Sequence, residues 1–174
     1  MIFRQITHDD LGCASYLVGD EHAGLAAVVD PKLEIDEYLH LARYMGVSIE
    51  HILETHIHAD HVSGHGRLAS ATRATIHINR HDGAGYEHEP FDDGWQLELG
   101  RIRVQAMHTP GHRPEHTAFA LADMARGPTS RSRRPRARAG SSARCATSSS
   151  PCRPRSRCGR GTSAARCAAA LRWI

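Results

Sequence analysis

Four side chains that can bind a metal lie close together in the heptapeptide Thr-His-Ile-His-Ala-Asp-His, Thr55 to His61. They are His56, His58, Asp60 and His61. Imidazole nitrogens combined with a carboxylate suit zinc or iron better than calcium or magnesium. The stretch therefore predicts a site for one or two ions of Zn(II) or Fe(II). The alternative interpretation is a polar loop that follows a core strand.

The spacing of these residues predicts how they divide between metal positions. If His56 and His58 lie at the end of a strand, their side chains point to the same face, because strand side chains alternate with a period of two. One metal can then bind both rings. Asp60 and His61 are adjacent, so a turn after the strand can direct them toward a second metal position.

A second group of histidines lies in the turn His108–His112, with His116 just beyond it. A zinc site built from His56 and His58 needs at least one more protein ligand. His112 is the candidate, because it would project from the Pro-Gly turn of a different strand. His116 is a candidate for hydrogen bonding to a ligand histidine. Ordinary loop histidines are the alternative.

The elements that must position these ligands form a mixed α/β pattern. Apolar runs and turn residues predict strands over 1–6, 15–18, 26–29, 49–53, 74–78, 96–99, 101–107 and 117–121. Helical spacing of apolar residues predicts helices around 35–45 and over 63–71. The segment 81–94 is expected to be a polar loop. The histidines then occupy loops at strand ends, where chemistry is usually found on a rigid scaffold.

The formal net charge of +3 averages two unlike parts. All 19 Asp and Glu and all 14 His lie within residues 1–123, whereas 13 of the 22 Lys and Arg lie within 124–174. There is no signal-peptide pattern and no apolar run of roughly 18 residues. We therefore expect a cytoplasmic protein without a membrane partner. Cys13 is the single cysteine of the first part, so no disulfide is expected there.

Two motifs resemble a known family. His56–His61 resembles the HxHxDH signature of the metallo-β-lactamase superfamily, and Thr109–His112 resembles its TPGH motif. Thr55–Gly64 is similar to the persulfide dioxygenase and glyoxalase II branch, and Gly111–His116 is similar to members that carry rhodanese-like domains or partners. The resemblance covers residues 1–123 and implies an αββα sandwich with the metal at one edge.

The resemblance implies two chemistries. In glyoxalase II-like members, His56, His58 and His112 would hold the first metal, and Asp60 and His61 the second. Metal-bound water would hydrolyse a thioester, oriented or deprotonated by Asp60. In persulfide dioxygenase-like members, a single iron would be held by His56, His112 and a later aspartate, and glutathione persulfide would be oxidised to sulfite.

The chain departs from the family after residue 123, because the Thr-Gly-Asp motif that carries the later aspartate is missing. Asp123 comes too early to replace it. Residues 124–174 form an Arg/Ala/Ser-rich tail, for which disorder or a frameshifted translation is the expectation. Nucleic-acid binding by this tail is a remote alternative. A further alternative is an inactive fragment, in which half a sandwich leaves its inner sheet face uncovered.

Overall fold

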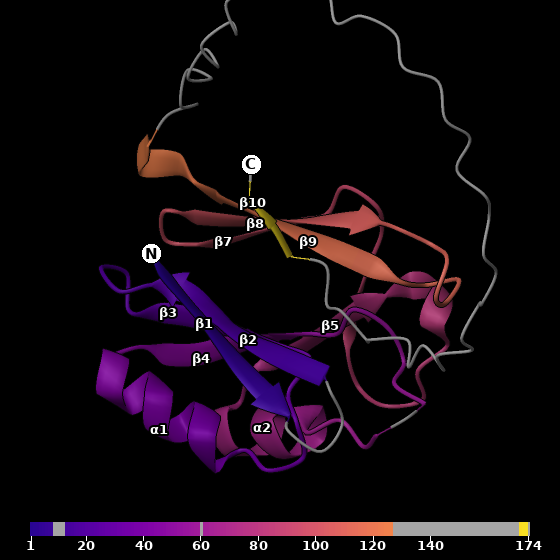
Figure 1. Cartoon of the computed structure of the whole chain (residues 1–174), viewed down its shortest axis with the longest axis horizontal. Helices are drawn as coiled ribbons and strands as arrows, with labels where there is room; N and C mark the ends of the chain where they lie inside the picture. Colours follow the sequence, from indigo (N-terminus) through magenta and orange to yellow (C-terminus); the bar gives the residue numbers. More distant parts are fainter. Residues whose placement is uncertain (9–12, 60, 127–170, 174) are drawn as a thin grey trace, which may run out of the picture. The chain divides into compact units, whose positions relative to one another are not determined.

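Two β-sheets and two α-helices make up the described part of the chain (Figure 1). The computed structural model describes residues 1–8, 13–59, 61–126 and 171–173. Met1–Gly127 and Arg166–Ile174 belong to one compact unit, and the second unit, Pro128–Ala165, lies outside the described residues. None of the described helices is long and apolar enough to span a membrane.

The first sheet follows the order of the chain, from β1 at one edge to β6 at the other. β1, β2 and β3 are antiparallel neighbours, whereas β3, β4, β5 and β6 are parallel. The parallel strands are joined through helices, as such crossovers require. The elements are β1 (Ile2–His8), β2 (Cys13–Asp20), β3 (Leu25–Val29), α1 (Asp36–Met45), β4 (Ser48–Leu53), α2 (His65–Thr72), β5 (Thr75–Asn79), the 3₁₀ turn Arg80–Asp82 and β6 (Glu89–Phe91).

The second sheet is an antiparallel meander with one added parallel strand. Its order is β10-β9-β8-β7, and β10 runs parallel to β9. The elements are β7 (Gln96–Leu99), β8 (Ile102–His108), β9 (Thr117–Asp123), the 3₁₀ turn Met124–Arg126 and β10 (Leu171–Trp173).

Both helices cover the face of the first sheet that points away from the second sheet (Figure 1). α1 starts with two acidic residues, Asp36 and Glu37, which suit the positive end of a helix dipole. It ends at Gly46, whose left-handed φ of 67° closes the last turn. Tyr38 is fully buried between α1 and the first sheet, in the same apolar cluster as Ala42.

The inner faces of the two sheets meet in a shared apolar core. On β8, Ile102, Val104 and Ala106 point inward at alternate positions, as the strand period requires. They pack with Phe119 of β9 and with Leu53 of β4. The expectation that half a sandwich leaves the inner face uncovered is therefore wrong, since the strands of both sheets that precede residue 126 already pack against one another. No helix among the described residues covers the outer face of the second sheet.

Two parts of the predicted secondary structure need correction. Residues 81–94 are not a continuous loop, because Glu89–Phe91 pairs with β5 as an edge strand. The sequence hides this strand because Pro90 lacks an N–H, which only an edge position tolerates. Leu171–Trp173 pairs with β9, although no structure was expected there. The rest of the predicted tail, including its expected disorder, falls mainly on residues 127–170, outside the described residues.

Asp20 ties the two sheets together at the edge opposite to the histidine motif. Its buried carboxylate accepts hydrogen bonds from the backbone N–H of Arg101 at 2.9 Å and from the guanidinium of Arg101 at 3.2 Å. These hydrogen bonds hold the pKa of Asp20 well below its usual range.

We expect Asp20→Asn to destabilise the fold by about 2 kcal/mol at neutral pH, because the charged acceptor is lost. A carboxyl whose pKa is depressed by folding contributes stability above its unfolded pKa of about 4 and loses it below. The difference in free energy of unfolding between wild type and Asp20→Asn should therefore become smaller as the pH falls below about 4. Urea unfolding at several pH values measures it. Glu98→Gln, which removes the exposed Glu98–Arg103 pair, is the matched control and should change little. An equal loss in both variants would contradict the argument.

Candidate metal centre

The polar side chains of the site lie at one edge of the first sheet. β1, β3, β4 and β5 run in the same direction, so their carboxyl ends meet at this edge. His8 ends β1, Asp30 follows β3, and the histidine motif follows β4. The second sheet reaches the same edge where β9 begins, because the N–H of Thr117 donates to the carbonyl oxygen of Thr55 at 2.9 Å.

Imidazole rings from both sheets gather around His56. The ring centre of His56 lies 4.3 Å from that of His58, 5.0 Å from that of His112 and 5.2 Å from that of His116. Two imidazoles bound to one ion with metal–nitrogen bonds of about 2.1 Å place their ring centres about 5 Å apart. His58 and His112 therefore both lie beside His56, and an imidazole donor set suits zinc or iron. That these three residues bind one ion stays a prediction.

A hydrogen-bonded chain fixes the ring of His56. The hydroxyl of Thr55 donates to the carboxylate of Asp30 at 2.7 Å, and the same oxygen lies 2.8 Å from Nδ1 of His56. A hydroxyl has one proton, so the Nδ1–H of His56 must be the donor in the second contact. The tautomer that results presents Nε2 as the metal-binding nitrogen. Burial, and next the neighbouring His58, lower the pKa of His56 to about 4, so the ring is neutral at physiological pH.

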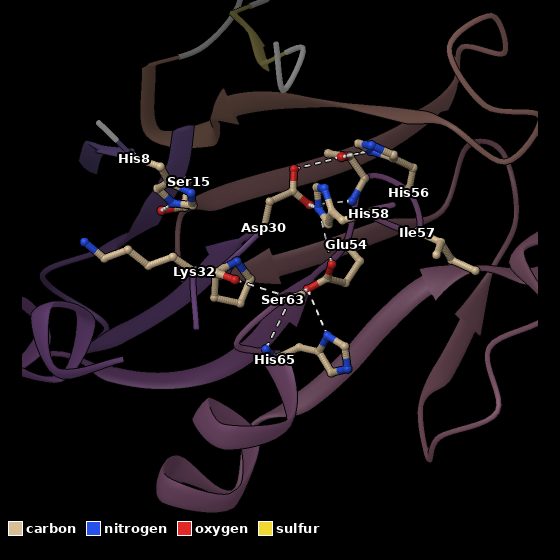
Figure 2. A network of polar contacts seen from close by, with 12 residues as sticks. His8, Ser15, Asp30, Lys32, Glu54, His56, Ile57, His58, Ser63 and His65 are labelled. Atoms are coloured by element: carbon tan, nitrogen blue, oxygen red, sulfur yellow. Dashed lines mark hydrogen bonds and ion pairs between the residues drawn. The ribbon is translucent and has the colours of Figure 1, made fainter. Parts of the chain in front are cut away.

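The structure also brings His58 between two buried carboxylates (Figure 2). Its Nε2 lies 3.3 Å from Asp30 and 3.6 Å from Glu54. The ligand atoms of these three residues all lie within 4.8 Å of one another, a spacing that His56, His58 and His112 do not share among the described residues. Burial raises the pKa of Glu54. His58 can therefore contact either the carboxylates or an ion shared with His56.

Glu54 also connects the motif to the start of α2. Its Oε1 accepts a hydrogen bond from Ser63 at 2.9 Å and lies 3.6 Å from Nδ1 of His65 (Figure 2). His65 in turn stacks on Tyr86, with ring centres 4.3 Å apart. The carboxyl group thus holds the loop 57–64 against the helix that follows it.

The turn between β8 and β9 presents two histidines in different ways. His112 is exposed, whereas His116 is half-buried and its Nδ1 lies 3.2 Å from the carbonyl oxygen of Thr109. The same Nδ1 lies 3.1 Å from the hydroxyl of Thr109, so Thr109 holds the ring of His116 through both oxygens. His116 is therefore as well placed near His56 as the predicted ligand His112. Glu115, which accepts from the N–H of Ile57 at 3.4 Å, ties the turn to the motif.

The second predicted metal position is described in part. His61 lies next to His58, with ring centres 4.3 Å apart, and His8 faces His61 edge-on at 5.9 Å. Asp60, predicted both as a ligand and as the group that orients water, lies outside the described residues. Asp123 ends β9, six residues along from Thr117 at the site. The strand therefore carries Asp123 roughly 20 Å away from the histidines.

Sequence reasoning missed the roles of Glu54, Thr55 and His8. Asp30 was not among the predicted site residues. A carboxylate directly before the Thr-His-x-His run was the available signal for Glu54, whereas His8 carries none. His77 was expected to be a core-edge or solvated residue. It is buried, and its Nε2 lies 3.0 Å from Nδ1 of His51, away from the cluster around His56.

The sequence profile of the metallo-beta-lactamase superfamily matches residues 8–124. The chain belongs to this superfamily. The matched range contains strands β2 to β9 and every histidine of the site, so the fold and the motif support the same assignment.

Curated relatives include enzymes of two kinds. The chain is 30% identical over 125 residues to the mitochondrial persulfide dioxygenase ETHE1 of Bos taurus, which covers 71% of this chain and 49% of the relative. It is 32% identical over 111 residues to the hydroxyacylglutathione hydrolase of Rhodospirillum rubrum, which covers 62% of this chain and 43% of the relative. The chain thus spans about half the length of the curated relatives that it matches.

Solved structures give the same fold. A metallo-beta-lactamase from Staphylococcus aureus has a TM-score of 0.68 at 34% identity and covers 73% of this chain and 40% of its own. ETHE1 from Myxococcus xanthus has a TM-score of 0.65 at 30% identity and covers 70% of this chain and 56% of its own. The predicted family and the mixed α/β sandwich are therefore confirmed.

Proposed function

We propose that this domain contains a metal centre that acts on a thiol adduct of the glutathione type. We propose persulfide oxidation as its reaction. The observation that carries the proposal is the group of imidazoles from both sheets around His56, in a chain about 30% identical to persulfide dioxygenases. In this reaction one O₂ takes four electrons from the outer sulfur of the persulfide, and with one water it yields sulfite, the free thiol and two protons.

Residues of this chain would hold the metal and shield it. His56 and His112 would bind an iron, with His58 or His116 as the next nearest imidazole. Iron held by few protein ligands supplies open positions for oxygen and sulfur. The bond from His56 through Thr55 to Asp30 keeps Nε2 aimed at the ion. The described residues offer the carboxylates of Asp30 and Glu54 beside His58, whereas the later aspartate that the family resemblance implies is not among them.

Thioester hydrolysis is the second candidate, and a specific contact favours it. His61 lies beside His58, so with Asp60 it would complete a second metal position. Two ions can generate and orient a hydroxide for attack on a carbonyl. The similarity to hydroxyacylglutathione hydrolases supports this alternative.

Activity of the full chain separates these possibilities. We expect chain loaded with Fe(II) to consume O₂ and release sulfite when glutathione persulfide is added. We expect His56→Ala to lower this rate at least about 100-fold, because a ligand is lost. His40→Ala, at an exposed position on α1, is the matched control and should keep the rate. Hydrolysis of lactoylglutathione with Zn(II) but no O₂ uptake would favour the second candidate, and neither activity would mark an inactive fragment.

A further inference from the structure

A cavity of about 670 Å³ opens directly beside the histidine cluster. His56, His58 and His61 form one side of it, and the start of α2 with residues 83–86 forms the other. A volume in this range is typical of sites for small-molecule ligands. A molecule in the cavity would therefore touch the predicted metal ligands at one end.

Arg67 supplies the fixed charge of this cavity. It is the single lysine or arginine among the described residues that line the cavity. Its side chain is exposed, and Nη1 contacts the carbonyl oxygen of Leu33, another lining residue, at 3.4 Å. Glu54 is buried in the wall, where its carboxylate accepts a hydrogen bond from Ser63 and lies 3.6 Å from ring nitrogens of His58 and His65. The cavity therefore favours an anionic ligand.

Glycines keep the cavity open. Gly66, Gly83 and Gly85 all line it, and a Cβ added at any of them would meet no atom within 4 Å. Gly83 has a left-handed φ of 72°, which explains its own identity. Gly66 and Gly85 have no such conformational need, so a larger side chain at either lining position would not strain the backbone.

We infer that this cavity is the substrate site and that Arg67 binds a carboxylate of the thiol adduct. The guanidinium fork pairs with a carboxylate through two parallel hydrogen bonds. The adduct would place its sulfur at the histidines and its carboxylate at α2, with Tyr86, stacked on His65, as the side wall. The inference rests on the proposed function, because that function supplies a ligand bearing both a sulfur and a carboxylate.

Binding of an unreactive ligand tests the inference without turnover. The probe is S-hexylglutathione, titrated calorimetrically into the full metal-loaded chain, beside its dimethyl ester, in which both carboxylates are capped. We expect Arg67→Gln to weaken binding of the acid about 10-fold and to leave binding of the ester unchanged. Arg67→Lys, which keeps the charge without the fork, should lose less. Arg43→Gln, at an exposed site on α1, is the matched control.

A second variant tests the location of the ligand. Gly85→Leu should weaken binding of both acid and ester, because the side chain occupies the cavity, while the thermal transition stays in place. Equal affinity of Arg67→Gln and wild type for the acid would overturn the role of Arg67. Unchanged binding to Gly85→Leu would overturn the site itself. Wild type that binds no S-substituted glutathione would overturn the proposed function as well, so the two failures are distinguishable.

Discussion

Thr55→Val is expected to bind Zn(II) or Fe(II) about 10- to 100-fold more weakly than wild type, although Thr55 is not itself a ligand. Valine has the shape of threonine but no hydroxyl, so the two hydrogen bonds that link Asp30 to His56 through Thr55 are lost. The ring of His56 is then free to rotate or to adopt the other tautomer, and Nε2 is no longer held toward the ion. The affinity is measured by competition with a chromophoric chelator.

Thr55→Ser is the matched control, because serine keeps the hydroxyl and loses only a methyl group. We expect its metal affinity to stay within a few-fold of wild type. A purely structural role for Thr55 would instead show as equal losses in the two variants. Nitrogen NMR of the histidine rings gives an independent measurement, since the Nδ1–H tautomer of His56 should dominate in wild type and in Thr55→Ser only. Loss of the tautomer in both would sink the argument.

The histidine motif could be predicted from the sequence because its geometry is local. The expected strand geometry is wrong, because β4 ends at Leu53 and both His56 and His58 lie in the loop that follows it. Their rings are still neighbours, with centres 4.3 Å apart, because the two residues are close in sequence. The TPGH turn could be recognised in the same way, and its arrival beside His56 is confirmed by the ring contact at 5.0 Å. Local patterns of this kind carry most of the information about ligand identity.

The partners of the ligands could not be predicted, because they depend on sheet register. Asp30 reaches Thr55 across 25 positions of sequence, through the parallel pairing of β3 with β4. His8 reaches His61 because β1 runs in the same direction as β3, which follows from two antiparallel pairings. Nothing in the residue types fixes these registers before the sheet is built.

The strands show the same contrast between local patterns, which can be predicted, and pairings between distant segments, which cannot. The apolar alternation of β8 predicts its inner face, but not that strands of the first sheet will cover it. Edge strand β6 has only three residues, one of them a proline, which is too short for a periodic signal. The pairing of β10 with β9 joins segments about 50 residues apart, a distance at which no local pattern operates.

Asp30→Ala is expected to cost about 3 to 5 kcal/mol of folding stability, the largest effect of any single change in the site. The carboxylate accepts from the N–H of Thr55 at 2.8 Å and from its hydroxyl at 2.7 Å, and it contacts His58 at 3.3 Å. All of these groups are buried, so its removal leaves donors without acceptors in a place that water does not reach. Asp30 also has a φ of 49°, a left-handed conformation that aspartate tolerates better than alanine.

Denaturant unfolding in the presence of a chelator measures this loss, since excess chelator removes any contribution of bound metal to stability. Asp36→Ala is the matched control, because Asp36 is exposed at the start of α1 and only favours the helix dipole. Asp30→Asn keeps an acceptor oxygen for the Thr55 N–H, so it should fall between alanine and wild type. If Asp30→Ala lost no more stability than Asp36→Ala, the carboxylate of Asp30 would orient the metal ligands without stabilising this edge of the sheet.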